Sequence, residues 1–208
     1  MKNLMLNTYL NIAVFASGKG SNFRAILDAI KAGKIQNAQI VLVVSNNSDA
    51  GALATARENN IPTLHISRKQ FTSDEDFNDV LLAKLSEYNV NFIALAGYMK
   101  KIDARIVRAF QNRMINIHPA LLPKYGGSGM YGMHVHEAVI ANKDKYSGAT
   151  VHIVDEEYDH GSVVLQKTVP VEENDTPETL AARVLQIEHE IYPEAIRLFS
   201  EGKVDISN

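Results

Sequence analysis

Residues 12–22 read Ile-Ala-Val-Phe-Ala-Ser-Gly-Lys-Gly-Ser-Asn, an unbroken apolar run that ends in a polar loop with two glycines. Residues 23–30 follow with apolar side chains at Phe23, Ile26, Leu27 and Ile30, a spacing that predicts a helix. An apolar strand, a tight turn and a helix form the repeating unit of parallel sheets that are covered on both faces. These residues therefore decide the expected fold class.

The same alternation continues along the first two thirds of the chain. We expect further strands at 40–45, 63–66, 92–96 and 114–118, separated by helices at 51–59, 73–88 and 103–110. Near-continuous apolar strands between helices favour a parallel sheet.

The pattern changes after Pro119. A short helix is expected at 135–141, and two strands at 149–154 and 163–171 are joined by an acidic turn, which predicts an antiparallel hairpin. Thr176-Pro177 then begins a final helix that reaches about Ser200. The expected fold is α/β: a Rossmann-like, mostly parallel sheet with helices on both faces, a C-terminal antiparallel hairpin and a long final helix.

The bulk properties narrow the class of protein. The chain has 208 residues, a net charge of −3 and no cysteine. We expect one domain over 1–208, with residues 1–10 as a short N-terminal extension. The small charge disfavours nucleic acid and anionic membranes as partners, and no apolar run reaches the ~20 residues that span a bilayer. Without cysteine or a secretory signal, we expect a cytoplasmic protein with no disulfide and no thiolate zinc site.

Two polar residues stand out in the strand at 114–118. Asn116 and His118 are two positions apart, so on a strand both side chains point to the same face. An amide can hold a carbonyl oxygen, and an imidazole can exchange a proton near neutral pH. Pro119 ends the strand, which places both groups near its carboxyl end, where open α/β sheets bind ligands.

The stretch Ile115-Asn116-Ile117-His118-Pro119-Ala120-Leu121-Leu122-Pro123 resembles the signature of the folate-dependent formyltransferases, and the resemblance extends from about Asn11 to about Gly202. Within this family the sequence looks most like the members that act on glycinamide ribonucleotide. The resemblance implies transfer of the formyl group of 10-formyltetrahydrofolate, a co-substrate, to the primary amine of N1-(5-phospho-D-ribosyl)glycinamide in purine synthesis. It implies no metal and no covalent enzyme intermediate.

The resemblance also implies a catalytic set of Asn116, His118 and Asp159. Asn116 would stabilise the oxyanion, and His118 would donate to the same oxygen and take part in proton transfer. Asp159 would favour the protonated imidazole and orient it. Taken alone, a histidine at a strand end is more often a packing residue, and an aspartate in an acidic turn is usually solvated. Asp155 is the neighbour most easily confused with Asp159.

The loop after the first strand is the expected phosphate site, through Gly18, Gly20, Ser21 and Asn22. Glycines allow close approach of the backbone, and a helix N-terminus favours an anion. A dinucleotide fingerprint is incomplete, because Phe23 stands where a third glycine would be needed. In the resembled family this loop holds the ribose phosphate, and Glu188 matches an acid that binds the glycinamide amine or the ribose.

The same resemblance implies a folate pocket. Its predicted residues are Tyr98, Met99, Lys100, Lys101, Ile102, Asn116, Asp155 and Asp159. Family members often have an arginine where this chain has Asp74, so we expect the glutamate tail of the folate to be held differently, with Lys100 or Arg68 as candidates.

Other interpretations stay open at this point. A methionyl-tRNA formyltransferase would normally carry a further C-terminal domain, and a 10-formyltetrahydrofolate hydrolase a further N-terminal one. An inactive folate- or nucleotide-binding module is a third alternative. His134 and His136 follow the glycine-rich segment 126–132, but no third ligand is evident and a metal is not expected. The expected partners are small-molecule substrates, and the expected assembly is a monomer or a homodimer.

Overall fold

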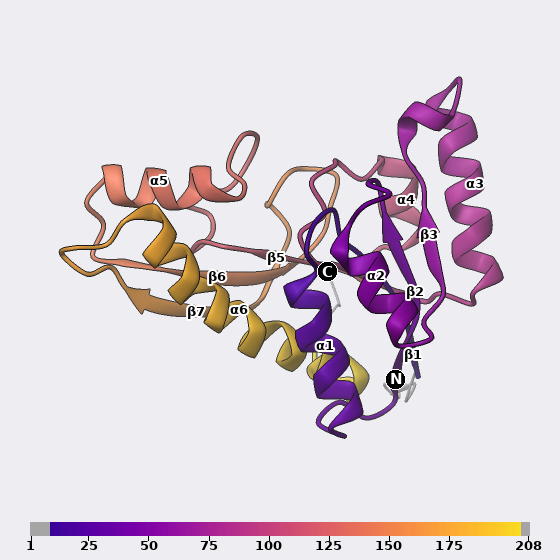
Figure 1. The fold of residues 1–208 in the computed structure, drawn as a ribbon, viewed down its shortest axis with the longest axis horizontal. Coiled ribbons are helices and arrows are strands. Elements are labelled where there is room, and N and C mark those ends of the chain that lie inside the picture. The colour runs from indigo at the N-terminus through magenta and orange to yellow at the C-terminus, as the bar shows by residue number, and fades with distance from the viewer. Residues whose placement is uncertain (1–8, 205–208) are drawn as a thin grey trace, which may run out of the picture. The chain divides into compact units, whose positions relative to one another are not determined.

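The computed structural model describes residues 9–204 and contains an α/β fold (Figure 1). The seven strands are β1 Leu10–Phe15, β2 Ala38–Ser45, β3 Thr63–His65, β4 Phe92–Leu95, β5 Met114–His118, β6 Tyr146–Ile153 and β7 Val163–Pro170, in the sheet order β3-β2-β1-β4-β5-β6-β7. The α-helices of this part of the chain are α1 Ser21–Lys31, α2 Gly51–Glu58, α3 Asp74–Glu87, α4 Ala104–Ala109, α5 Met133–Ala141 and α6 Pro177–Ser200, and a 3₁₀ turn η1 covers Arg68–Gln70.

The chain divides into two compact units. Within the described residues, the first comprises residues 9–100 and 193–204, and the second comprises Lys101–Tyr192. The prediction of a single domain stays a prediction. The N-terminal extension predicted at 1–10 falls mainly on residues 1–8, which lie outside the described residues, and Leu10 already belongs to β1.

The first unit contains the parallel part of the sheet. β1 pairs in parallel with both β2 and β4, and β2 pairs in parallel with β3. All four residues of β4 are buried. Because successive side chains of a strand point to opposite faces, such a strand is covered on both sides. Helices α1 and α2 contact each other and β2, so both pack against the parallel strands of this unit.

The second unit contains the antiparallel part. β5 pairs with β6, and β6 pairs with β7, each in antiparallel register. Tyr192 on α6 is fully buried, and its hydroxyl donates a 3.2 Å hydrogen bond to the carbonyl oxygen of Ile115 on β5. Gly161 is required here, because a Cβ at this position would lie 1.9 Å from the carbonyl oxygen of Ile153.

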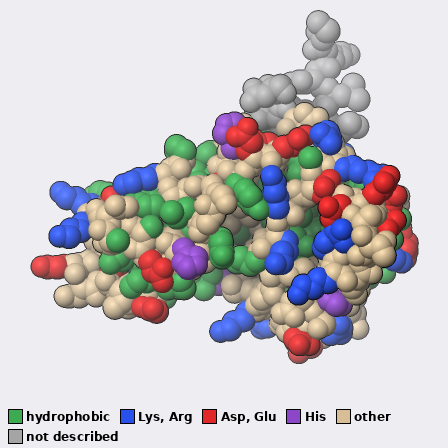
Figure 2. Space-filling model, turned by 90° about the horizontal axis from the view of Figure 1, so that it is seen from above, with side chains coloured by type: hydrophobic (Ala, Val, Ile, Leu, Met, Phe, Trp, Pro, Cys, Tyr) green, Lys and Arg blue, Asp and Glu red, His purple; other side chains and the backbone are tan. Residues whose placement is uncertain are grey.

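The predicted fold class is confirmed, and the element boundaries differ by a few residues. β5 and the end of α6 fall where the sequence placed them. β6 begins at Tyr146, earlier than predicted, because its first residues pair with the end of β7, a long-range contact that a local pattern does not report. No helix within residues 9–204 has the length and apolar composition needed to cross a membrane. On the face drawn in Figure 2, acidic and basic side chains are interspersed.

The start of α3 offers a test of the local structure. The hydroxyl of Ser73 accepts a 3.0 Å hydrogen bond from the backbone N–H of Asp76 and so caps the helix. We expect Ser73→Ala to lower the free energy of unfolding by about 1 kcal/mol. Urea denaturation measures this change. Ser86→Ala is the matched control on the same helix, since Ser86 is exposed and caps nothing; an equal loss in both variants would contradict the assignment.

Candidate active site

Four polar side chains share one face of the β5–β6 pair. In the antiparallel register Asn116 lies opposite His152, and His118 lies opposite Thr150. Directly opposite residues of an antiparallel pair project from the same face, so the two strands present these groups together. His118, Thr150 and His152 are polar but buried, and their neighbours along the two strands are mostly apolar. Two strands of the second unit therefore build a polar centre inside an otherwise apolar environment.

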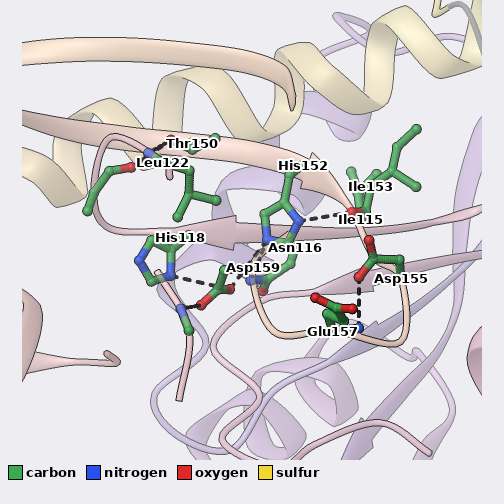
Figure 3. A network of polar contacts seen from close by, with 12 residues as sticks. Ile115, Asn116, His118, Leu122, Thr150, His152, Ile153, Asp155, Glu157 and Asp159 are labelled. Atoms are coloured by element: carbon green, nitrogen blue, oxygen red, sulfur yellow. Dashed lines mark hydrogen bonds and ion pairs between the residues drawn. The ribbon is translucent and has the colours of Figure 1, made fainter. Parts of the chain in front are cut away.

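Asp159 reaches this centre from the turn between β6 and β7 (Figure 3). Its Oδ1 lies 3.5 Å from Nδ1 of His118 and 3.5 Å from Nε2 of His152. The backbone N–H of Gly127 donates a 3.0 Å hydrogen bond to the other carboxylate oxygen, Oδ2. The structure thus brings together the three residues predicted as the catalytic set.

The turn that carries Asp159 is held at several points. The guanidinium of Arg108 donates a 2.9 Å hydrogen bond to Glu156, and the ammonium of Lys101 lies 5.2 Å from the ring centroid of Tyr158. Asp159 has a left-handed backbone, with φ of 54°, a conformation that aspartate tolerates better than most residues. Its side chain is only 11% exposed, so the carboxylate is directed inward.

The hydrogen bonds of His118 define its neutral form. Nε2 lies 2.8 Å from the carbonyl oxygen of Tyr125. A carbonyl oxygen only accepts hydrogen bonds, so Nε2 carries a hydrogen. Nδ1 is then the nitrogen that can take up a proton, and it is the one that faces Asp159. The contact with Asp159 becomes an ion pair when the imidazole is protonated.

Burial decides the pKa of His118. Removal from water lowers the pKa below its ordinary value of 6.5, and nearby His152 acts in the same direction. The charge of Asp159 and the hydrogen bond to Tyr125 raise it, but by less. Asp159 therefore favours the protonated imidazole, as predicted, yet the net shift is downward. His118 is neutral at neutral pH.

The carboxylate of Asp159 is ionised under the same conditions. Burial raises its pKa, but the nearby imidazoles of His152 and His118 and the backbone N–H of Gly127 together outweigh burial and lower it. A neutral base beside a fixed negative charge is an arrangement suited to accepting a proton, because the resulting cation is stabilised where it forms.

His152 is a site residue that our interpretation of the sequence missed. Its Nδ1 donates to the carbonyl oxygen of Ile153 at 2.9 Å, which leaves Nε2 to accept a 3.2 Å hydrogen bond from the amide of Asn116. This contact orients Asn116 and leaves its second amide hydrogen for a ligand. The available signal was Thr150 and His152, two positions apart in an apolar strand, which repeats the spacing of Asn116 and His118.

Thr150 has a different task from His152. Its hydroxyl donates to the carbonyl oxygen of Ala120 at 2.6 Å and accepts from the backbone N–H of Leu122 at 3.1 Å. The side chain of Gln166 on β7 donates a further 2.9 Å hydrogen bond to it. Thr150 thereby fixes the chain that leaves β5.

Asp155 stabilises the turn between β6 and β7 through its hydrogen bonds. Its Oδ1 accepts from the backbone N–H of Glu157 at 2.9 Å, and its Oδ2 lies 2.9 Å from Nδ1 of His160 (Figure 3 shows the first of these contacts). Asp155 is therefore a turn-forming residue in this structure, and the carboxylate directed at His118 belongs to Asp159. The predicted contact of Asp155 with folate stays a prediction.

The predicted phosphate loop lies in the first unit, between β1 and α1. Gly20 has φ of 76°, and a Cβ there would lie 2.7 Å from that of Ala52, so only glycine fits. Helix α1 begins at Ser21, has no acidic residue in its first turn and receives no side-chain cap. The positive end of the helix dipole at this terminus favours an anion. Gly18 is exposed, and Asn22 is buried.

The predicted folate segment follows β4. The backbone N–H of Met99 donates to the hydroxyl of Ser17 at 2.8 Å, and the ring of Tyr98 packs edge-on against Phe15. Burial raises the pKa of Tyr98 to about 12. Met99 and Lys100 are exposed and free to contact a ligand, whereas Ile102, in the second unit, is only 9% exposed. Lys101 stacks on Tyr158, as described above.

The remaining candidates fall in separate places. Glu188 on α6 is buried, so it does not lie on a solvated helix face. Arg68 forms an ion pair with Asp74, which ties one candidate for the folate tail to the residue that replaces the family's arginine. His134 and His136 both belong to α5, where residues two apart point in different directions; His134 is exposed and His136 is buried. Among residues 9–204 no cluster of His, Cys, Asp or Glu is arranged to hold a metal.

Comparison with known proteins agrees with this geometry. The family model for formyl transferase matches residues 10–196. The chloroplastic phosphoribosylglycinamide formyltransferase of Arabidopsis thaliana is 46% identical over 194 residues, which cover 93% of this chain and 66% of that protein. The phosphoribosylglycinamide formyltransferase of Escherichia coli strain K12 is 38% identical over 195 residues, 94% of this chain and 89% of that protein.

The solved structure of glycinamide ribonucleotide transformylase 1 from Symbiobacterium toebii superimposes with a TM-score of 0.87 at 39% identity, covering 97% of this chain and 92% of that one. The chain therefore belongs to the formyl transferase family. Members of this family use a formyl folate as co-substrate.

The protonation of His118 gives a prediction that needs no substrate. NMR titration should show its pKa below 6.5 and that of His160 above it, because His160 is paired with Asp155 at the surface. Asp159→Asn should lower the pKa of His118 further, since it removes the charge that opposes burial. A pKa of His118 that rises in this variant would contradict the assignment.

The same shift affects stability. The unfolded chain binds a proton at His118 near pH 6.5, whereas the folded state resists it. The contribution of His118 to stability is therefore full above that pH and falls as the pH drops below it.

Proposed function

We propose that this protein transfers the formyl group of 10-formyltetrahydrofolate to the primary amine of N1-(5-phospho-D-ribosyl)glycinamide, a step of purine synthesis. The observation that carries the proposal is the joining of Asn116, Asp159 and the buried His118 in one centre. The names of the relatives at 46% and 38% identity agree with it. The products are the N2-formyl ribonucleotide and tetrahydrofolate.

The first step is attack of the neutral amine on the formyl carbon, which places negative charge on the formyl oxygen. Asn116 donates an amide hydrogen to that oxygen, while His152 holds the amide in position through the other hydrogen. A donor of this kind contributes about 2.7–4 kcal/mol to transition-state stabilisation. No side chain needs to form a covalent bond to the substrate.

The second requirement is movement of a proton from the amine nitrogen to the departing folate nitrogen. His118 begins neutral, because burial lowers its pKa, and takes the proton at Nδ1. Asp159 lies 3.5 Å away and stabilises the cation. The imidazolium can donate a hydrogen bond to the formyl oxygen and then transfers its proton to the leaving folate nitrogen, so no net proton is gained or lost.

The remaining contacts bind the two substrates. We assign the ribonucleotide phosphate to Gly18, Gly20, Ser21 and Asn22, and its glycinamide or ribose to Glu188. We assign the folate to the segment 98–102 and to the turn with Asp155 and Asp159. The first turn of α1 lacks acidic residues, which favours an anion at this end of the helix.

The runner-up functions are hydrolysis of 10-formyltetrahydrofolate and binding without turnover. A hydrolase would use the same centre to activate water, and a binding module would need no proton relay. The ionised Asp159 held against a neutral His118 favours an active centre over a binding module.

The proposal also covers the partners, location, metal content and assembly of the protein. We expect small molecules as the partners, a cytoplasmic location, no bound metal, and a monomer or homodimer. Sedimentation velocity over a range of concentrations measures the assembly, and metal analysis of purified active protein measures the metal content.

The central prediction concerns Asp159→Asn. We expect kcat for formyl transfer to fall by about 10²–10⁴-fold, the range of general acid–base contributions, because the imidazolium loses its counter-charge. The assay follows formation of tetrahydrofolate from 10-formyltetrahydrofolate with the ribonucleotide as acceptor. Asp155→Asn is the matched change in the same turn, and it should alter KM for the folate far more than kcat.

The outcomes separate the alternatives. Full activity of Asp159→Asn would keep the reaction but remove Asp159 from the mechanism. If 10-formyltetrahydrofolate is consumed at a rate that does not depend on the ribonucleotide, the hydrolase is favoured. If either ligand binds but no turnover occurs, the binding module is favoured.

A further prediction tests the phosphate loop. Ser21→Ala removes a hydroxyl donor at the start of α1, and hydrogen bonds to charged groups contribute about 1.5–3 kcal/mol, so affinity for the ribonucleotide should fall about 10- to 100-fold. Calorimetric titration measures the affinity. The matched control is the ligand without its phosphate, whose weaker binding should be the same in both proteins; equal losses for both ligands would contradict a phosphate contact.

A further inference from the structure

Tyr125 has an unusual backbone beside the candidate active site. Its φ is 62°, in the left-handed region that bulky residues seldom adopt. It opens the glycine-rich segment that follows β5, and the next residue, Gly126, lies against the Cβ of Asp159, where an added Cβ would come within 3.2 Å. Backbone strain of this kind persists only where surrounding contacts enforce it, so contacts of Tyr125 with its neighbours must hold it in this conformation.

The backbone of this segment contacts both members of the proton-transferring pair. The carbonyl oxygen of Tyr125 accepts from Nε2 of His118 at 2.8 Å, and the N–H of Gly127 donates to Oδ2 of Asp159 at 3.0 Å. A rotation of the Tyr125 peptide would therefore remove the acceptor that keeps the hydrogen of His118 on Nε2. With that hydrogen free to move to Nδ1, the nitrogen facing Asp159 would no longer be a base.

The side chain of Tyr125 is anchored away from the site. Its hydroxyl donates a 2.7 Å hydrogen bond to Oδ2 of Asp144 and accepts a 3.0 Å hydrogen bond from the amide of Asn142. Asp144 lies between α5 and β6 and is 22% exposed on its side chain. Lys124 also contacts this carboxylate, at 2.6 and 2.8 Å, but its side chain is 61% exposed.

We propose that Tyr125 and Asp144 are positioning residues for the proposed formyl transfer. The bond from the phenol to the carboxylate holds the Tyr125 peptide so that its carbonyl selects the Nε2–H tautomer of His118 and leaves Nδ1 as the base facing Asp159. This inference rests on the proposed function, because it assigns His118 its role in the reaction. Neither residue touches the reacting atoms.

Lys124 has no corresponding role. Among residues 9–204, its side chain contacts Asp144 and the ring of Tyr125 and forms no hydrogen bond or ion pair with His118. The ammonium of Lys124 is exposed, so solvent weakens its ion pair with Asp144. A change of Lys124 therefore perturbs the same carboxylate while leaving the phenol–carboxylate hydrogen bond intact.

The test uses Tyr125→Phe and two changes of Asp144. Tyr125→Phe keeps the ring and removes the hydroxyl. Asp144→Ala removes the acceptor, whereas Asp144→Asn keeps an amide oxygen that can still accept from the phenol. We expect Tyr125→Phe and Asp144→Ala each to lower kcat by about tenfold, the low end for residues that orient a site residue, with KM for both substrates unchanged. Asp144→Asn and Lys124→Gln should retain the activity of the parent protein.

Two further measurements separate positioning from loss of structure. The double variant Tyr125→Phe/Asp144→Ala should fall no further than either single variant, since both break one hydrogen bond. Nitrogen NMR of histidine-labelled protein should show neutral His118 with its hydrogen on Nε2 in the parent protein and in Asp144→Asn, and a mixture of tautomers in Tyr125→Phe and Asp144→Ala.

The NMR result does not depend on the reaction. An unchanged tautomer in Tyr125→Phe would overturn the inference even if formyl transfer occurs. A changed tautomer in a protein whose parent form transfers no formyl group would retain the positioning and reject the proposed function. Equal losses in Lys124→Gln and Asp144→Ala would also overturn it, because both would then reflect the stability of the segment.

Discussion

The antiparallel pairing of β5 with β6 is the constraint on which the candidate site depends. Its register places Asn116 opposite His152 and His118 opposite Thr150, so both strands contribute polar groups to one face. A shift of one strand by one residue would turn its polar groups to the other face, because side chains alternate along a strand. The turn after β6 places Asp159 at the same face, where its carboxylate lies beside the imidazoles of His118 and His152.

The chemistry depends on the opposing effects of burial and of neighbouring charges on the pKa values of His118 and Asp159. Burial of His118 lowers its pKa, and the charge of Asp159 offsets only part of that shift. The same burial would raise the pKa of Asp159, but two imidazoles and a backbone N–H reverse the direction. The result is a neutral base beside an ionised acid. Such a pair can accept a proton and stabilise the charge that forms, as transfer of an acyl group to an amine requires.

The sequence predicted much of the fold and less of the site. Apolar runs with intervening helical spacing sufficed for the strands, and β5 was placed to the residue. The sequence interpretation also selected Asn116, His118 and Asp159, the last from a family resemblance and not from its own turn chemistry. His152 was missed, because a single histidine in an apolar strand gives no local sign of what lies opposite. Asp155 and Asp159 are equally plausible locally, and their contacts differ only in three dimensions.

The sequence by itself determined the α/β class, the order of the elements and the residue types capable of the chemistry, because periodicity and turn residues are local properties. The tertiary structure alone decided three things: the register that pairs Asn116 with His152, the tautomer of His118 and the direction of its pKa. The register and the pKa depend on groups far apart in the chain, and the tautomer depends on the path of the segment from His118 to Tyr125. Hydrogen-bond partners and exclusion of water exist only once β5, β6 and the segment around Tyr125 have packed together.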